Sequence, residues 1–271
     1  VEMGTRRADS SLDYQTGSVD LGQGLAQIEL GDSFRFLGPD DARRVIEKAW
    51  GNPPENAVLG MVVPLDVSPM NPKQGWGVVV TYVADGHVGD EGGALDGEEL
   101  LGRLQRLAER ASDRRKAGGY PPLGLVGWAR SPHYDGANHS LSWAQHVRVG
   151  GDETLNYSVR VLGRNGVLYL DAVARMNQLE SLRPRFDEIA GSVAFTEGNR
   201  YEDYVEGEDL EAAYTLSGLV LGKRGTKSGL GLGSPPVLAA GFGALALGGL
   251  LFGVRRRRNK AAPVAPPQPA R

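Results

Sequence analysis

Apolar and polar residues alternate in runs of strand length along most of the first 200 positions, and stretches of helical period separate these runs. The segments 19–30 and 34–37 predict short strands, and the β-branched runs at 57–65 and 75–83 predict two longer strands that pair with each other. Between them, residues 39–50 predict a helix with acidic residues in its first turn. A longer helix is predicted to begin at Asp96, which offers a side-chain N-cap.

The second half of the chain is richer in strand patterns. Four runs, at 123–130, 140–149, 153–163 and 166–174, follow one another through short polar loops. Asn165-Gly166 lies between the last two and is a strong hairpin signal. A helix with apolar residues at helical spacing follows, within 177–195, and ends in a brief strand. We therefore expect four consecutive antiparallel strands in this half.

Strand pairs separated by single helices predict an α+β fold in which antiparallel sheets carry helices packed on one side. The arrangement is sandwich-like, and two similar lobes within residues 19–200 are one way to divide it. Residues 1–18 are polar and without periodicity, so a flexible N-terminal segment is expected. Residues 201–234 combine a short helical pattern with a glycine- and serine-rich tether.

The C-terminal pattern differs from the rest of the chain. Residues 235–254 are uncharged and apolar throughout, which is about the length that a helix needs to cross the hydrocarbon of a bilayer. A buried helix of a large core would show amphipathic interruptions, and none is present. The sequence therefore predicts one transmembrane helix, followed by a basic tail rich in proline and alanine at 255–271.

The distribution of charge orients this predicted span. Six of the 30 basic residues and none of the 33 acidic residues follow position 254, so residues 1–254 carry a formal charge of −9. By the positive-inside rule, Arg255, Arg256, Arg257, Arg258 and Lys260 place the C-terminus in the cytoplasm. The body is then expected outside the cytoplasm, anchored in a bacterial inner membrane. Residues 1–35 contain no apolar signal core, so we infer a chain from which an export signal was removed. The competing topology is a tail anchor with the body in the cytoplasm.

The same composition narrows the range of partners. An acidic body disfavours nucleic acid, because affinity for phosphates depends on Lys and Arg. The chain contains no cysteine, which excludes disulfides, thiolate zinc sites and thiol nucleophiles. No metal and no cofactor is expected. Small residues recur through the span, where they allow close helix approach and thus a homo-oligomer or docking on another membrane protein: Ala240, Ala244, Gly248, Gly249 and Gly253.

The densest chemical cluster is "SPHYDGANHSLSWAQH". His133, Asp135 and His139 are the candidate catalytic residues, because imidazole and carboxylate groups serve as general acids and bases. If residues 139–147 form a strand, His139 shares a face with Trp143 while His146 points to the other side, so these two histidines cannot meet on one metal ion. The alternative is a hairpin loop whose polar residues satisfy backbone groups.

Three phrases of the sequence, "GNPP", "GYPP" and "PHYD", lie in longer stretches that resemble a bacterial membrane-anchored family, domain of unknown function 2167. The resemblance covers about residues 19–255. It implies an exported body followed by one C-terminal span, with no established activity and no catalytic residues to transfer.

Three functional hypotheses follow. The first is a non-enzymatic envelope protein that binds a protein partner or ligand through its outer domain and assembles through its span. The second is an envelope hydrolase acting on a glycan or peptide. The third is a subunit of a larger membrane protein complex.

Overall fold

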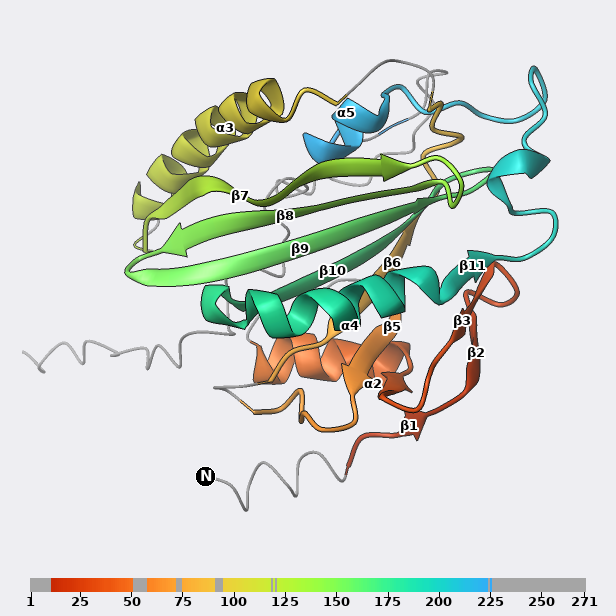
Figure 1. The fold of residues 1–271 in the computed structure, drawn as a ribbon, viewed down its shortest axis with the longest axis horizontal. Coiled ribbons are helices and arrows are strands. Elements are labelled where there is room, and N and C mark those ends of the chain that lie inside the picture. Colours follow the sequence, from red (N-terminus) through yellow and green to blue (C-terminus); the bar gives the residue numbers. More distant parts are fainter. Residues whose placement is uncertain are drawn as a thin grey trace, which may run out of the picture.

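A computed structural model describes residues 11–50, 58–71, 75–90, 95–117, 119, 121–223 and 225. Within them, one antiparallel sheet of eight strands dominates the fold (Figure 1). In spatial order its strands are β1 (Tyr14–Gln15), β4 (Phe34–Leu37), β5 (Val58–Pro64), β6 (Val78–Val83), β10 (Val167–Arg175), β9 (Asp152–Leu162), β8 (Ser140–Val149) and β7 (Leu123–Asp135). A small second sheet consists of β11 (Val193–Phe195), β3 (Ala26–Glu29) and β2 (Ser18–Leu21).

The helical elements connect and cover these sheets. They are α2 (Pro39–Arg44), which continues as one π-helical turn η1 (Val45–Ala49), α3 (Gly97–Ala117), η2 (Met176–Gln178), α4 (Leu179–Gly191), η3 (Tyr201–Asp203) and α5 (Leu216–Val220). Asp96 caps α3 as predicted, because its Oδ1 accepts hydrogen bonds from the backbone amides of Glu98 and Glu99 at 3.0 and 2.9 Å.

The predicted strand pairs are confirmed. β5 pairs with β6, and β7 to β10 form four consecutive antiparallel strands. The turn between β9 and β10 contains Asn165-Gly166, and the amide of Gly163 donates to the carbonyl of Gly166 at 2.9 Å. A Cβ on Gly166 would lie 2.3 Å from the carbonyl oxygen of Val83, so only glycine lets this turn approach β6.

One pairing joins the two halves of the chain. β6 is the last strand before α3, and it pairs with β10 over six residues, from Val167↔Val83 to Ala172↔Val78. The longer strands of the two halves therefore belong to one continuous sheet, while β2, β3 and β11 form the small second sheet. β1 and the start of β2 fall within residues 1–18, where we expected a flexible segment.

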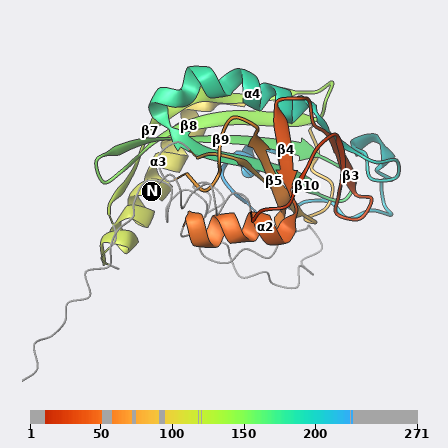
Figure 2. The same ribbon diagram turned by 90° about the horizontal axis from the view of Figure 1, so that it is seen from below.

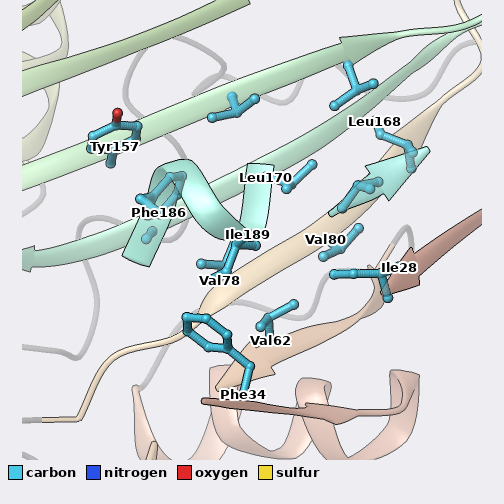
Figure 3. Packing of buried hydrophobic residues seen from close by; sticks show 14 of the residues in the cluster. Ile28, Phe34, Val62, Val78, Val80, Tyr157, Leu168, Leu170, Phe186 and Ile189 are labelled. Carbon is cyan, nitrogen blue, oxygen red and sulfur yellow. The ribbon is translucent and has the colours of Figure 1, made fainter. Parts of the chain in front are cut away.

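The helices cover both faces of the sheet, and the prediction that they pack on one side is wrong. On one side, here called the α4 face, Phe186 and Ile189 of α4 pack in one core with Val78 and Leu170 (Figure 3). The small sheet closes the same core through Ile28. Figure 2 shows α4 and α2 on opposite sides of the sheet.

The opposite side, here called the α3 face, carries two further cores. Leu104 of α3 packs with Trp143 and Tyr169, and Ile46 of η1 packs with Met61. The sequence explains why both faces need a cover. β5 and β6 have apolar residues at successive positions, as in "MVV" and "VVV", so apolar side chains emerge on both sides.

The predicted transmembrane helix at 235–254 and the basic tail at 255–271 lie outside the described residues. Among the residues that are described, no helix is both long and apolar enough to cross a membrane.

Candidate functional site

A hollow of about 690 Å³ lies on the α4 face, beside the C-terminal end of α4. We call it the β7–α4 groove. Its floor is apolar, formed by Val159 and Val161 of β9 together with Phe195 of β11. The hollow exists because α4 ends at Gly191 and because the residues of β8 at this point are the small Ser140 and Ser142.

All three candidate catalytic residues line this groove. His133 and Asp135 lie opposite Ser142 and Ser140 in the β7–β8 register, so they occupy the same face of β7. His139 follows the hairpin turn and has a positive φ of 44°. The hairpin that carries the three candidates therefore borders the groove.

Their hydrogen bonds do not form a catalytic relay. The carboxylate of Asp135 accepts from Asn138 Nδ2 at 2.7 Å and from the amide of Ala137 at 3.0 Å. These bonds hold the pKa of the Asp135 carboxyl below its ordinary value. His139 Nδ1 lies 3.3 Å from the hydroxyl of Tyr134. Within the described part of the chain, no hydrogen bond joins any two of the three candidates.

The geometry matches the alternative interpretation, in which the polar residues of the hairpin satisfy backbone groups of its turn. Asp135 stabilises the hairpin turn, as Asp-Gly sequences commonly do. His146 points away from Trp143 and instead contacts Glu153, which agrees with the strand alternation that we used to separate His146 from His139. Among the described residues, no three His, Asp or Glu side chains lie together in a way that could hold a metal ion.

One end of the groove is bordered by a charged cluster that connects β7 with α4. Arg130 Nη1 donates to Asp187 Oδ1 at 2.8 Å and also contacts the hydroxyl of Tyr157. That hydroxyl donates to the same Asp187 oxygen at 3.0 Å, and burial raises the pKa of Tyr157. Because each of these groups already has a partner, the cluster positions α4 rather than offering a free acid or base.

The other end is bordered by His139 and Tyr201, which belong to a row of four contacting aromatic rings that we call the ring column. His139 stacks on Tyr201 with ring centroids 4.0 Å apart, Tyr201 contacts His87 at 4.3 Å, and His87 stacks on Tyr204 at 4.0 Å. The tyrosine hydroxyls are bonded as well. Tyr201 donates to the carbonyl of Val88 at 3.1 Å, and Tyr204 donates to Glu211 Oε1 at 3.0 Å.

His87 is the most enclosed member of the ring column. It is 9% exposed, and its Nδ1 is buried without a hydrogen-bond partner. Burial lowers the pKa of His87. This effect outweighs hydrogen bonds to the backbone of Gly163 and Arg164 and the charges of Asp90 and Glu211, all of which act to raise it.

The sequence did not reveal the ring column. Tyr201 and Tyr204 are three residues apart, which places them on one side of a helical turn, and that spacing was the available signal. Nothing in the sequence, however, pairs them with His87, which is more than a hundred positions away.

A second polar region lies on the α3 face of β9, and we call it the Arg160 row. Arg160 is 3% exposed, and its Nη2 lies 3.0 Å from Asp171 Oδ1 of β10. Ser158 donates to the same oxygen at 2.6 Å. The guanidinium also lies 3.9 Å from the centre of the Tyr169 ring. Burial lowers the pKa of Arg160, while Asp171 acts to raise it.

Further polar side chains extend the Arg160 row along β9 and onto β8. Four buried polar atoms in it have no hydrogen-bond partner, and these are Gln145 Nε2, Thr154 Oγ1, Asn156 Oδ1 and Arg160 Nε. The row combines a charge pair with unpaired polar atoms, which makes it an unusual interior rather than an open site.

The other residues that the sequence singled out cannot be placed. The small residues Ala240, Ala244, Gly248, Gly249 and Gly253, and the cations Arg255 to Arg258 and Lys260, lie outside the described residues.

Comparison with known proteins gives a family match but no described activity. The model of a family described as "Protein of unknown function (DUF2167)" matches residues 13–245. No curated protein matches the chain.

Two solved structures show a distant likeness. The solution structure of cyanobacterial PsbP (CyanoP) from Synechocystis sp. PCC 6803 is 10% identical, with a TM-score of 0.37, over 68% of this chain and 92% of that one. The crystal structure of LpqN, involved in cell envelope biogenesis of Mycobacterium tuberculosis, is 14% identical, with a TM-score of 0.34, over 69% of this chain and 94% of that one. Neither likeness bears on function.

Proposed function

The chain belongs to the DUF2167 family of proteins of unknown function, and we propose that it is a non-catalytic binding module of the bacterial cell envelope. The β7–α4 groove is its binding site. One observation carries this proposal: the groove is of ligand size, and among the described residues no hydrogen bond joins any two of the ionisable candidates that line it.

The groove has the size of a small-molecule binding site, with both apolar and polar side chains in its lining. Its volume of about 690 Å³ falls within the range of roughly 300–1,000 Å³ that is typical of small-molecule sites. The floor of Val159, Val161 and Phe195 can bury apolar surface. Polar side chains in its lining, among them Ser142 and Arg200, can orient a ligand through hydrogen bonds.

A hydrolase is the less favoured alternative. General acid–base or nucleophilic catalysis requires a base within hydrogen-bond reach of its partner. His133, Asp135 and His139 share the groove without such a contact, and Asp135 is bound within its own turn.

The location in the envelope rests on the sequence. An uninterrupted apolar run at 235–254 followed by five cations supports one membrane span with the body outside the cytoplasm. The small residues within the run support assembly with a second copy or with another membrane protein.

Site-directed photo-crosslinking in intact cells tests the binding site. A photo-reactive residue at position 142 of the full chain is expected to form one discrete adduct. The same residue at position 126, where the exposed Val126 lies outside the groove, is expected to form none. An Ala194→Trp substitution should fill the groove and abolish the adduct. Equal adducts at both positions, or no adduct at position 142, would contradict the proposal.

Protease accessibility in spheroplasts tests the location separately. We expect the body to be digested while a C-terminal tag survives. A protected body would place the groove in the cytoplasm and would overturn the envelope assignment.

A further inference from the structure

The wall of the β7–α4 groove near η3 belongs to a segment that is bonded to the rest of the fold at its start, through Thr196, and at several points along its length. We call residues 196–214 the η3 segment. Arg164 binds Asp209 through two bonds of 2.8 and 3.0 Å, and Tyr214 donates to Asp85 at 2.9 Å. Arg200, Tyr201 and Glu202 of this segment line the groove.

His87 connects the η3 segment to the sheet in two ways. Its backbone amide donates to the carbonyl of Leu210, and its carbonyl accepts from the amide of Ala212, each at 2.8 Å. Its ring lies between Tyr201 and Tyr204 of the same segment. The ring therefore lies between the segment and the sheet and contacts Tyr201, whose hydroxyl is also bonded to the carbonyl of Val88 and the amide of Asp90.

Charged and titratable groups approach His87 from every side. They comprise Asp85 and Asp90 on its own stretch of chain, Asp209, Glu211, Tyr201 and Tyr204 on the η3 segment, Arg164 in the β9–β10 turn, and His139 and Tyr134 at the β7–β8 hairpin. The acids favour a protonated imidazole. Several of them are already engaged, because Asp209 binds Arg164, Asp90 binds Tyr134 and Glu211 binds Tyr204.

We propose that protonation of His87 releases the η3 segment and opens the β7–α4 groove, so that ligand binding by this chain responds to mild acid. This proposal rests on the proposed function for its biological meaning, since it describes the regulation of that site.

The burial of His87 sets the direction of the pH response. In the closed arrangement the imidazole is enclosed and its pKa is lowered, whereas in an open arrangement the ring meets water and regains a pKa of about 6.5. The open form then binds the proton more tightly than the closed form. Lowering the pH below about 6.5 therefore shifts the population toward the open form.

The absence of cysteine from the chain makes a distance measurement straightforward. Two cysteines, Glu202→Cys in η3 and Arg110→Cys on the exposed side of α3, would carry spin labels in the full chain in detergent micelles. We expect one narrow distance at pH 8 and a second, longer population at pH 5. A distribution that does not change between these pH values would overturn the proposal.

Two variants assign the response to His87. His87→Phe keeps an aromatic ring between the tyrosines but cannot be protonated, so it should hold the narrow distance at pH 5. His133→Gln removes an exposed histidine of the groove outside the ring column and should respond as the wild type does. Equal responses in the two variants would show that another group senses the proton and would refute the role of His87.

A measurement on the unsubstituted ring covers the case in which His87→Phe does not fold. NMR of histidine-labelled, spin-free protein gives the titration of His87, which should coincide with the pH at which the longer distance appears. Different midpoints would contradict the proposal. Neither measurement needs a ligand, so either can fail while crosslinking at the groove succeeds, and the reverse also holds.

Discussion

The two faces of β9 differ in chemistry but not in burial. On the α4 face this strand presents Leu155, Tyr157, Val159 and Val161, and on the α3 face it presents Thr154, Asn156, Ser158 and Arg160. All eight side chains are buried. When apolar and polar residues alternate along a strand, one face of the strand is usually buried and the other faces water. Here alternation separates two kinds of interior, an apolar one against α4 and a polar one that contains a charge pair.

The two interiors are stabilised differently. Burying a Val or Leu side chain on the α4 face contributes about 1.5–3 kcal/mol. On the α3 face, the attraction between Arg160 and Asp171 offsets the cost of removing both charges from water. Each unpaired polar atom in the Arg160 row costs about 1–3 kcal/mol more. The apolar face therefore raises the free energy of unfolding, and the unpaired polar atoms of the other face lower it.

Breaking the charge pair should have the largest effect. Asp171→Ala leaves the guanidinium of Arg160 buried without its partner, and we expect a loss of about 3–5 kcal/mol in the free energy of unfolding. Urea unfolding measures this. The matched control is Asp66→Ala, which removes the exposed partner of Arg185 and should cost less than about 1 kcal/mol. Equal losses in the two variants would mean that the buried pair contributes no more than an exposed one.

A polar group placed on the apolar face should have an intermediate effect. Val159→Thr keeps the size of the side chain but buries a hydroxyl on the α4 face, where we expect a loss of about 1–3 kcal/mol. Thermal unfolding monitored by circular dichroism checks it. A stability equal to that of the wild type would show that this face tolerates polar groups as the other does.

The reverse substitution on the opposite face should have a small effect of opposite sign. Thr154→Val removes a buried hydroxyl that has no partner, so stability should stay the same or rise by up to about 1 kcal/mol. The same unfolding assay applies. A loss comparable to that of Val159→Thr would reveal that Thr154 is bonded in solution.

The smallest expected effect depends on pH. Because the pKa of His87 is lowered in the folded chain, the unfolded chain binds its proton more tightly. Stability is therefore fully present above a pH of about 6.5 and declines as the pH falls toward the folded pKa. Urea unfolding at pH 8, 6 and 5 should show a steeper decline in the wild type than in His87→Phe. Parallel curves would exclude a contribution from His87.

Local signals predicted much of this architecture. Asp96 caps α3, and the glycine turn after Asn165 joins β9 to β10, because caps and tight turns depend on neighbouring residues. The sequence placed His133 and Asp135 on a loop between two strands, whereas β7 extends to Asp135 and carries both. Strand alternation could not show that both faces of the sheet are covered, since this depends on α2 and α4 returning to opposite sides.

The features that the sequence did not predict depend on contacts between segments far apart in the chain. The bond from Tyr201 to the carbonyl of Val88 joins residues 113 positions apart, and no local pattern predicts it. The buried charge pair was missed for the same reason. Arg160 and Asp171 have the charges of surface residues, and only the fold shows that the rings of Tyr169 and Trp143 pack against Arg160.

The small sheet has a consequence for the time course of folding. Val193 of β11 pairs with Ile28 of β3, so strands from near both ends of the described chain complete the same core. Contacts so far apart in sequence form slowly, because the chain must close a long loop before they can stabilise it. An emerging polypeptide cannot complete this core until residue 195 is available. A chain cut before β11 should remain open at that edge, where proteases can reach it.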